Sequence, residues 1–333
     1  MLPRISKYEN GELVYGEPAL KYRENEAISN SDLSLIKKSP DLIEWNREIQ
    51  ASDELTSSSI LEGSLFHKLF LETEFYSTLK KIAFSQEKEG CIDDYTLKVF
   101  SDNCISLENK RVITTISGLR ATLKSDGFPI KTTTELSECL KIIEDNNLSY
   151  TFLDEELKKA QEEGYDFLNG EQIKKYFLMY QSILAHKEFM KLYETYWESE
   201  VSLYLNPSEI TYGLPLKGRI DMLTRFGDVY YIVDIKTISN LDDLEKNIRN
   251  YGYFRQAAFY KFLLGNILKI DASKIEFLFA FVETSPKLGK YRSLVARVGD
   301  DSLNVGISEM AELLESYAIY NSRNQDTLTF KTI

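Results

Sequence analysis

The apolar and polar positions at the start of the chain predict an extended arm followed by helices. Residues 1–27 are polar with scattered aromatics and no clear period, which is typical of an extended segment. A short helix is expected next, capped by Ser29 or Asn30 and stopped by Ser39-Pro40. We therefore expect residues 1–84 to form an arm and a set of helices.

A second helix is predicted over 58–71, and it carries one of the two histidines of the chain. Its apolar residues recur four positions apart and so share one face: Leu61, Leu65 and Leu69. His67 lies on a neighbouring face, one turn after Gly63. Such a histidine is more often a core residue than a ligand, but Gly63 would allow another backbone to approach this helix closely.

Residues 85–196 are highly charged and predict a helical insertion without a recognisable motif. The helices expected in this segment span 134–146, 154–163 and 170–196. All three cysteines of the chain lie here: Cys91, Cys104 and Cys139. Because the chain has no CxxC or Cys/His cluster, neither a zinc site nor a disulfide framework is expected.

The pattern changes near residue 197, where strands begin to alternate with helices. The expected strands span 200–205, 216–226, 229–236, 275–283 and 291–298. The expected helices span 243–265 and 302–320. Strands joined by a crossover helix predict a mixed α/β core over residues 197–333.

Composition narrows the classes of protein. The chain has 40 Lys and Arg against 52 Asp and Glu, a formal net charge of −12. This excludes a protein that coats nucleic acid by bulk charge, but it allows DNA to bind in a local groove. Several cations could line such a groove, although each of them alone is more often a solvated surface charge: Lys37, Lys38, Arg249, Arg255 and Lys261. The chain shows neither a signal peptide nor the ~20 apolar residues of a membrane-spanning helix, so we expect a cytoplasmic protein.

The segment 216–237 carries the residues that indicate chemistry. Gly227-Asp228 is a plausible two-residue hairpin turn, because glycine adopts the positive φ that such turns require. If Phe226 pairs with Val229, the continuing register places Asp221 opposite Asp234. Carboxylates so placed repel each other unless a divalent cation lies between them.

Two further groups complete this candidate site. Lys236 shares a face with Asp234, and the carbonyl of Ile235 offers another hard oxygen ligand for Mg²⁺ or Mn²⁺. A cation with a lysine beside it is suited to phosphodiester hydrolysis. Gln256 and Tyr260, one turn apart on the following helix, can close over the site. An isolated D-x-K would more often be a pair of solvated surface residues.

Taken in order, these elements resemble the PD-(D/E)xK nuclease superfamily in its RecB-like branch. The matching elements are His67, Gly218-Arg219-Ile220-Asp221, Asp234-Ile235-Lys236-Thr237 and Gln256-x-x-x-Tyr260. More narrowly, phrases such as ILEGSLFHKLFLE, GLPLKGRIDML and YGYFRQAAFY are similar to phage and prophage RecE-type exonucleases (the exonuclease VIII family). The resemblance covers about residues 22–75 and 197–285.

The resemblance implies a restriction-endonuclease-like core, with a mixed twisted sheet flanked by helices and a helical N-terminal elaboration. It implies residue roles as follows: His67, Asp221 and Asp234 as metal ligands, Lys236 as the catalytic lysine, and Gln256 and Tyr260 as residues that position the lysine and DNA. Glu200 stands where many members keep an acidic residue near a second metal, although a glutamate that opens a strand is common. Ser39 replaces the cysteine with which some members bind an iron–sulfur cluster, so no cluster is expected.

The expected function is that of an Mg²⁺-dependent deoxyribonuclease, an exonuclease that degrades duplex DNA from its ends. The resemblance implies 5′→3′ polarity, a ring-shaped homo-oligomer, a single-strand annealing partner and a role in phage-type recombination or DNA processing in the host cytoplasm. The alternatives are an endonuclease or end-trimming nuclease of the same fold, or a catalytically inactive DNA- or protein-binding module.

Overall fold

The computed structural model describes residues 3–50, 58–71, 96–100, 104–107, 112–113, 116–148, 151–152, 165–168 and 170–327. The chain forms two compact units, one built from residues 1–71 and 179–333 and the other from residues 72–178. The predicted boundaries at 84 and 196 differ from this division, because the N-terminal segment and the α/β core belong to one unit. The predicted helix 154–163 and Cys91 lie outside the described residues.

The first unit is organised around a seven-stranded sheet with the order β1-β2-β8-β9-β10-β11-β12. Its strands are β1 (Arg4–Tyr8), β2 (Gly11–Tyr15), β8 (Trp197–Leu205), β9 (Leu216–Phe226), β10 (Val229–Ile238), β11 (Ile275–Glu283) and β12 (Ser293–Arg297). Only the β10–β11 pair is parallel among the neighbours in this sheet, which makes the sheet mixed. The predicted α/β class is confirmed.

The N-terminal segment forms a hairpin that extends the sheet, so the prediction of an extended arm over 1–27 is wrong. β1 pairs with β2, and β2 pairs with β8 from Gly11↔Leu205 to Val14↔Ser202. A Cβ at Gly11 would lie 2.0 Å from the Tyr204 carbonyl oxygen, so only glycine fits there. The sequence pattern missed this hairpin because its burial depends on β8, which is distant along the chain.

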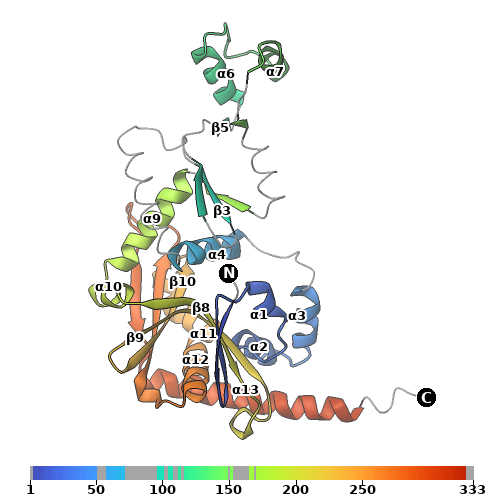
Figure 1. Cartoon of the computed structure of the whole chain (residues 1–333), viewed down its shortest axis with the longest axis vertical. Helices are drawn as coiled ribbons and strands as arrows, with labels where there is room; N and C mark the ends of the chain where they lie inside the picture. Colours follow the sequence, from blue (N-terminus) through green and yellow to red (C-terminus); the bar gives the residue numbers. More distant parts are fainter. Residues whose placement is uncertain are drawn as a thin grey trace, which may run out of the picture. The chain divides into compact units, whose positions relative to one another are not determined.

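Helices cover both faces of the sheet (Figure 1). The helices of the first unit are α1 (Ala19–Glu24), α2 (Asn30–Ile36), α3 (Leu42–Gln50), α4 (Ser58–Leu71), α10 (Lys187–Tyr193), α11 (Leu244–Tyr251), α12 (Tyr253–Leu268) and α13 (Asp300–Thr327). α9 (Gly170–Leu184) begins in the second unit and ends in the first. Ser29 caps α2 through a capping box with Asp32, as expected for one of its two candidate caps. None of the helices in the described ranges is long and apolar enough to cross a membrane.

Two predicted helices are each divided in two. The helix expected over 170–196 is broken between α9 and α10, where His186 takes the N-cap position and its Nε2 lies 3.0 Å from Ser293 Oγ. The helix expected over 243–265 is broken at Gly252, whose φ of +63° ends α11 and begins α12. Glycine adopts this left-handed conformation readily, whereas other residues do so at a cost.

α12 lies on the main hydrophobic core and is anchored by a buried arginine. Phe259, Leu263 and Leu264 of α12 are fully buried in this core, which α12 shares with α2, α13 and one face of the sheet. Arg255 is 2% exposed and contacts Asn30 Oδ1, Glu309 Oε1 and Ser34 Oγ. Arg255 therefore connects three helices, and its prediction as a groove-lining cation is wrong.

The second unit contains strands as well as helices, so its prediction as a helical insertion is incomplete. β3 (Thr96–Phe100) pairs with β4 (Cys104–Leu107) and β7 (Tyr165–Leu168), and β5 (Val112–Ile113) pairs with β6 (Thr151–Phe152). α6 (Ile116–Ser125) and α7 (Leu136–Asp145) pack through a small core: Leu119, Leu123, Ile130 and Cys139.

Gly252→Ala should destabilise the protein by about 1–2 kcal/mol, because an L-residue is strained at this φ and the new Cβ would lie 2.8 Å from Arg255 Nη2. Gly299→Ala is the matched control, since no atom lies within 4 Å of the Cβ position there and its φ is not left-handed. Urea unfolding of the two variants measures the difference. Equal stability of both variants would show that Gly252 is not required to separate α11 from α12.

Candidate active site

The site lies at a fork in the sheet, where β9 separates from β10. The predicted register is confirmed: the ladder runs from Val229↔Phe226 to Val233↔Met222. It ends one pair short of Asp221 and Asp234. Beyond this point the start of β9 leaves β10 and instead binds the Ile28 segment through backbone hydrogen bonds.

Asp221 and Asp234 do not simply face each other across the hairpin as expected. Asp221 Oδ2 accepts a hydrogen bond of 2.7 Å from the backbone N–H of Ile235. The carboxylate therefore takes the place of the backbone carbonyl that would accept this bond if the ladder continued. The N–H and C=O of one residue in a strand point to the same side, so the Ile235 carbonyl also points into the fork. Its proposed role as a metal ligand stays a prediction.

His67 reaches the fork from α4, which packs against β10. A Cβ at Gly63 would lie 3.0 Å from Thr237 Oγ1, so the glycine allows the close approach expected from the sequence. One turn later, His67 Nε2 lies 2.8 Å from Asp221 Oδ2 and His67 Nδ1 lies 3.1 Å from Glu200 Oε1. The structure thus brings His67 and Asp221 together.

Glu200 lies inside β8 and completes this cluster. Its neighbours pair with β9 as Ser199↔Met222 and Val201↔Ile220, which places Glu200 opposite Asp221. Its φ is +51°, a left-handed conformation that is strained for a residue other than glycine. The sequence analysis left the role of Glu200 open. Neither the pairing of β8 with β9 nor the left-handed φ of Glu200 can be predicted from the residues near it in the chain.

The other half of the site lies on the α12 side of the sheet. Asp234 and Lys236 share one face of β10 with Ile232 and Ile238, which belong to the core shared with α12. Lys236 Nζ lies 2.7 Å from Asp234 Oδ2, and the Gln256 side-chain amide donates a hydrogen bond to Asp234 Oδ1. Gln256 therefore contacts the carboxylate rather than the lysine that the resemblance implies.

Tyr260 closes the same side of the fork. A Cβ at Gly218 would lie 3.1 Å from the Tyr260 ring, so this glycine makes room for the aromatic side chain over β9. Burial raises the pKa of the Tyr260 hydroxyl well above its usual value, which keeps the hydroxyl protonated at neutral pH. Gln256 and Tyr260 thus lie on one face of α12, as their spacing predicts.

The charged groups at the fork shift one another's pKa values. Burial lowers the pKa of His67, but Asp221 and Glu200 outweigh it and raise that pKa to about 10. Burial alone would raise the pKa of Asp221, yet His67 and Lys236 lower it. Asp234 is 2% exposed, and burial together with the charge of Asp221 raises its pKa despite Lys236. Mutual repulsion between two carboxylates is the condition that a bound cation relieves.

The donor groups fit a divalent cation. Ligand atoms of His67, Glu200 and Asp221 all lie within 4.8 Å of one another, the one such group of His, Cys, Asp or Glu within the described ranges. His67 Nε2 and Asp221 Oδ2 lie 2.8 Å apart, a hydrogen-bond distance, and Asp234 lies outside this group of three. Asp234 Oδ2 is buried and contacts Lys236 Nζ at 2.7 Å, so a cation bound there would share this oxygen with the lysine.

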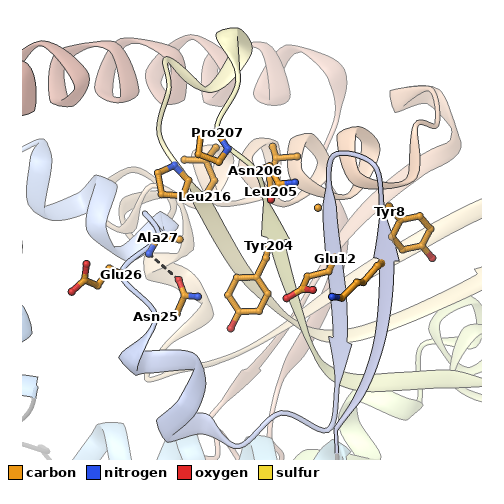
Figure 2. Close-up of a pocket in the computed structure, with 13 residues that line it drawn as sticks. Tyr8, Glu12, Asn25, Glu26, Ala27, Tyr204, Leu205, Asn206, Pro207 and Leu216 are labelled. Carbon is orange, nitrogen blue, oxygen red and sulfur yellow. Dashed lines mark hydrogen bonds between the residues drawn. The ribbon is translucent and has the colours of Figure 1, made fainter.

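A pocket of about 570 Å³ lies elsewhere in the first unit, between the N-terminal hairpin, β8 and residues 25–27. Figure 2 shows Tyr204, Glu12 and Asn25 around it, with Asn25 accepting a hydrogen bond from the backbone of Ala27. None of the predicted site residues lines this pocket. The fork, rather than the pocket, therefore contains the candidate chemistry.

Comparison with known proteins supports the fold. A family model described as a PDDEXK-like domain of unknown function (DUF3799) matches residues 140–326. A search of curated proteins found no match.

Several solved structures are similar to this chain at low identity. A “Putative exonuclease” from Eubacterium rectale is 18% identical with a TM-score of 0.35, covering 60% of this chain and 72% of its own. SSO0001 is 14% identical with a TM-score of 0.26, covering 74% and 86%. Protein VC1899 from Vibrio cholerae is 14% identical with a TM-score of 0.20, covering 79% and 58%.

Gly63→Ala should displace α4 from β10 and weaken Mn²⁺ binding by roughly tenfold, because His67 would move away from Asp221. Adding Thr237→Ala removes the hydroxyl that the new methyl group meets at 3.0 Å and should restore most of the affinity. Isothermal titration calorimetry with Mn²⁺ measures both effects. If Gly63→Ala binds Mn²⁺ as tightly as the wild type, the close approach of α4 does not set the position of His67.

Proposed function

The chain belongs to the family of PDDEXK-like domains described as DUF3799, and on this premise we propose that it is a metal-dependent deoxyribonuclease. The observation that carries the proposal is the convergence at one fork of an imidazole, buried carboxylates and a lysine. These are the groups required for hydrolysis of a phosphodiester bond by a bound hard cation. The substrate is DNA, in keeping with the RecB-like order of the motifs.

Each residue of the fork has a role in this proposal. His67, Asp221 and Asp234 hold Mg²⁺ or Mn²⁺, with the Ile235 carbonyl and Glu200 beside them. When bound, the cation lowers the pKa of a coordinated water and neutralises charge on the phosphate. Lys236 orients the attacking water and stabilises negative charge developing on the phosphate oxygens.

α12 supports these groups in the proposed reaction. Gln256 holds Asp234 by donating to Oδ1, which leaves Oδ2 directed at Lys236. Tyr260 covers β9 at Gly218 and keeps its hydroxyl protonated, so it can donate a hydrogen bond to a DNA phosphate. Because Asp234 and Gln256 are almost fully buried, their arrangement is set before substrate binds.

The finer proposal is an exonuclease that degrades duplex DNA from its ends with 5′→3′ polarity. It rests on the similarity of the motif phrases to RecE-type exonucleases, which also suggests a ring-shaped homo-oligomer and a single-strand annealing partner. A net charge of −12 favours a closed channel with local positive charge over an open basic surface. A role in phage-type recombination or DNA processing belongs to the same proposal.

Digestion of end-labelled linear duplex DNA and of closed circular DNA in Mg²⁺ tests the function. The exonuclease should degrade the linear DNA, release the label at a 5′ end first and leave the circle intact. Nicked circles would instead indicate an endonuclease. Absence of cleavage of either substrate in Mg²⁺ or Mn²⁺ would contradict the proposal and indicate a binding module.

Lys236→Ala should lower the single-turnover rate by about 10²-fold or more while DNA and Mn²⁺ still bind, because the lysine stabilises charge in the transition state. Asp234→Ala should abolish cleavage and weaken Mn²⁺ binding as well. Lys274→Ala, an exposed cation just before β11 at the end of the sheet away from Asp234, is the control and should cleave at the wild-type rate. Loss of DNA binding with an unchanged rate would make Lys236 a phosphate-binding residue instead.

A further inference from the structure

The backbone of Glu200 has a left-handed conformation inside β8, next to the fork. A left-handed residue other than glycine inside a strand costs of order 1–3 kcal/mol and persists only where its surroundings enforce it. On β9, Ile220 and Leu223 lie on either side of Asp221, the residue opposite Glu200. Both pack into the core shared with α12, although strict alternation along a strand would place their side chains on opposite faces of the sheet. The two strands therefore change their facing together at Glu200 and Asp221, and both carboxylates point toward α4.

The two oxygens of Glu200 contact different protein groups. Oε1 lies 3.1 Å from His67 Nδ1, and Oε2 forms an ion pair with Arg219 Nε. The other imidazole nitrogen, His67 Nε2, lies against Asp221. Arg219, Glu200 and His67 thus form a series of contacts on the Nδ1 side of the imidazole ring, and the Nε2 atom of the same ring faces the fork.

Arg219 is itself held in place. Its side chain is 18% exposed, and its guanidinium carbon lies 5.8 Å from the centre of the Tyr22 ring. The same ring faces Lys217 Nζ at 4.7 Å, and that ammonium donates to the backbone carbonyls of Tyr22 and Asn25. The segment that carries Tyr22 is thereby tied to β9, so Arg219 has a fixed surface to lie on.

We propose that Glu200 and Arg219 are positioning residues for His67. The Glu200 carboxylate accepts a hydrogen bond from the Nδ1–H of His67, which leaves Nε2 as the metal-binding nitrogen, and Arg219 fixes the position of that carboxylate. Metal-binding histidines commonly donate their second nitrogen to a carboxylate, which sets the tautomer and orients the ring. The inference rests on the proposed metal-dependent function and specifies how one of its ligands is oriented.

The rival role for Glu200 is that of a direct metal ligand. Its place in the cluster with His67 and Asp221 is compatible with that role. Its contacts favour positioning, because Oε1 lies against the Nδ1 nitrogen of His67 and Oε2 forms an ion pair with Arg219, so the carboxylate links the arginine to the back of the imidazole ring. The two roles predict different effects on the imidazole, which makes them separable.

The test combines Mn²⁺ affinity with the tautomer of His67 in the full-length protein. With only two histidines in the chain, long-range ¹H–¹⁵N NMR of the imidazoles in Mg²⁺ resolves His67, and His186→Gln assigns the signals. The wild type should show His67 protonated at Nδ1. Glu200→Gln and Arg219→Gln should each weaken Mn²⁺ binding about 10–100-fold in calorimetry and reduce the Nδ1-protonated population.

Matched controls lie on the same two strands. Glu198→Gln on β8 and Arg225→Gln on β9 remove the same charges outside the fork and should change neither readout. Weaker Mn²⁺ binding by Glu200→Gln with an unchanged His67 tautomer would make Glu200 a direct ligand and overturn the proposal. Unchanged affinity and tautomer in both variants would overturn it as well. If the wild type binds neither ion, the proposed function fails first.

Discussion

Asp221 and Asp234 place two carboxylates at one fork of the sheet, where β9 and β10 stop exchanging backbone hydrogen bonds. Burial disfavours their charged forms, and their repulsion raises the pKa of Asp234. Removing one partner from such a buried charged group is costly, because the other charge is left uncompensated. Neighbouring helices and strands therefore have to place hydrogen-bond donors and positive charges next to the two carboxylates.

The compensation comes from both faces of the sheet. α4 brings His67 to Asp221, and its approach depends on the absence of a side chain at Gly63. α12 brings Gln256 to Asp234, and its position depends on the buried Arg255. His67 and Gln256 thus reach the fork from separate helices, and the strands between them carry the two carboxylates.

The strands β8 to β12 and most helices could be predicted from local patterns because each pattern reflects a face buried along one element. The bounds of β9, β11 and α4 match their predicted ranges. Predictions failed where burial depends on a distant partner or where a single backbone conformation interrupts a periodic pattern. The hairpin of β1 and β2 is an example of the first case, and Gly252 at the break between α11 and α12 is an example of the second.

The sequence by itself determined the β9–β10 register, because a turn at Gly227 sets the pairing from Val229↔Phe226 to Val233↔Met222. It also placed His67 one turn after the glycine that admits its helix. The tertiary structure alone decided which groups lie behind His67 and Asp234. Glu200 reaches His67 because β8 happens to be the neighbour of β9 and because its own φ is left-handed. Contacts between segments far apart in the chain follow from strand order and packing, for which local periodicity carries no signal.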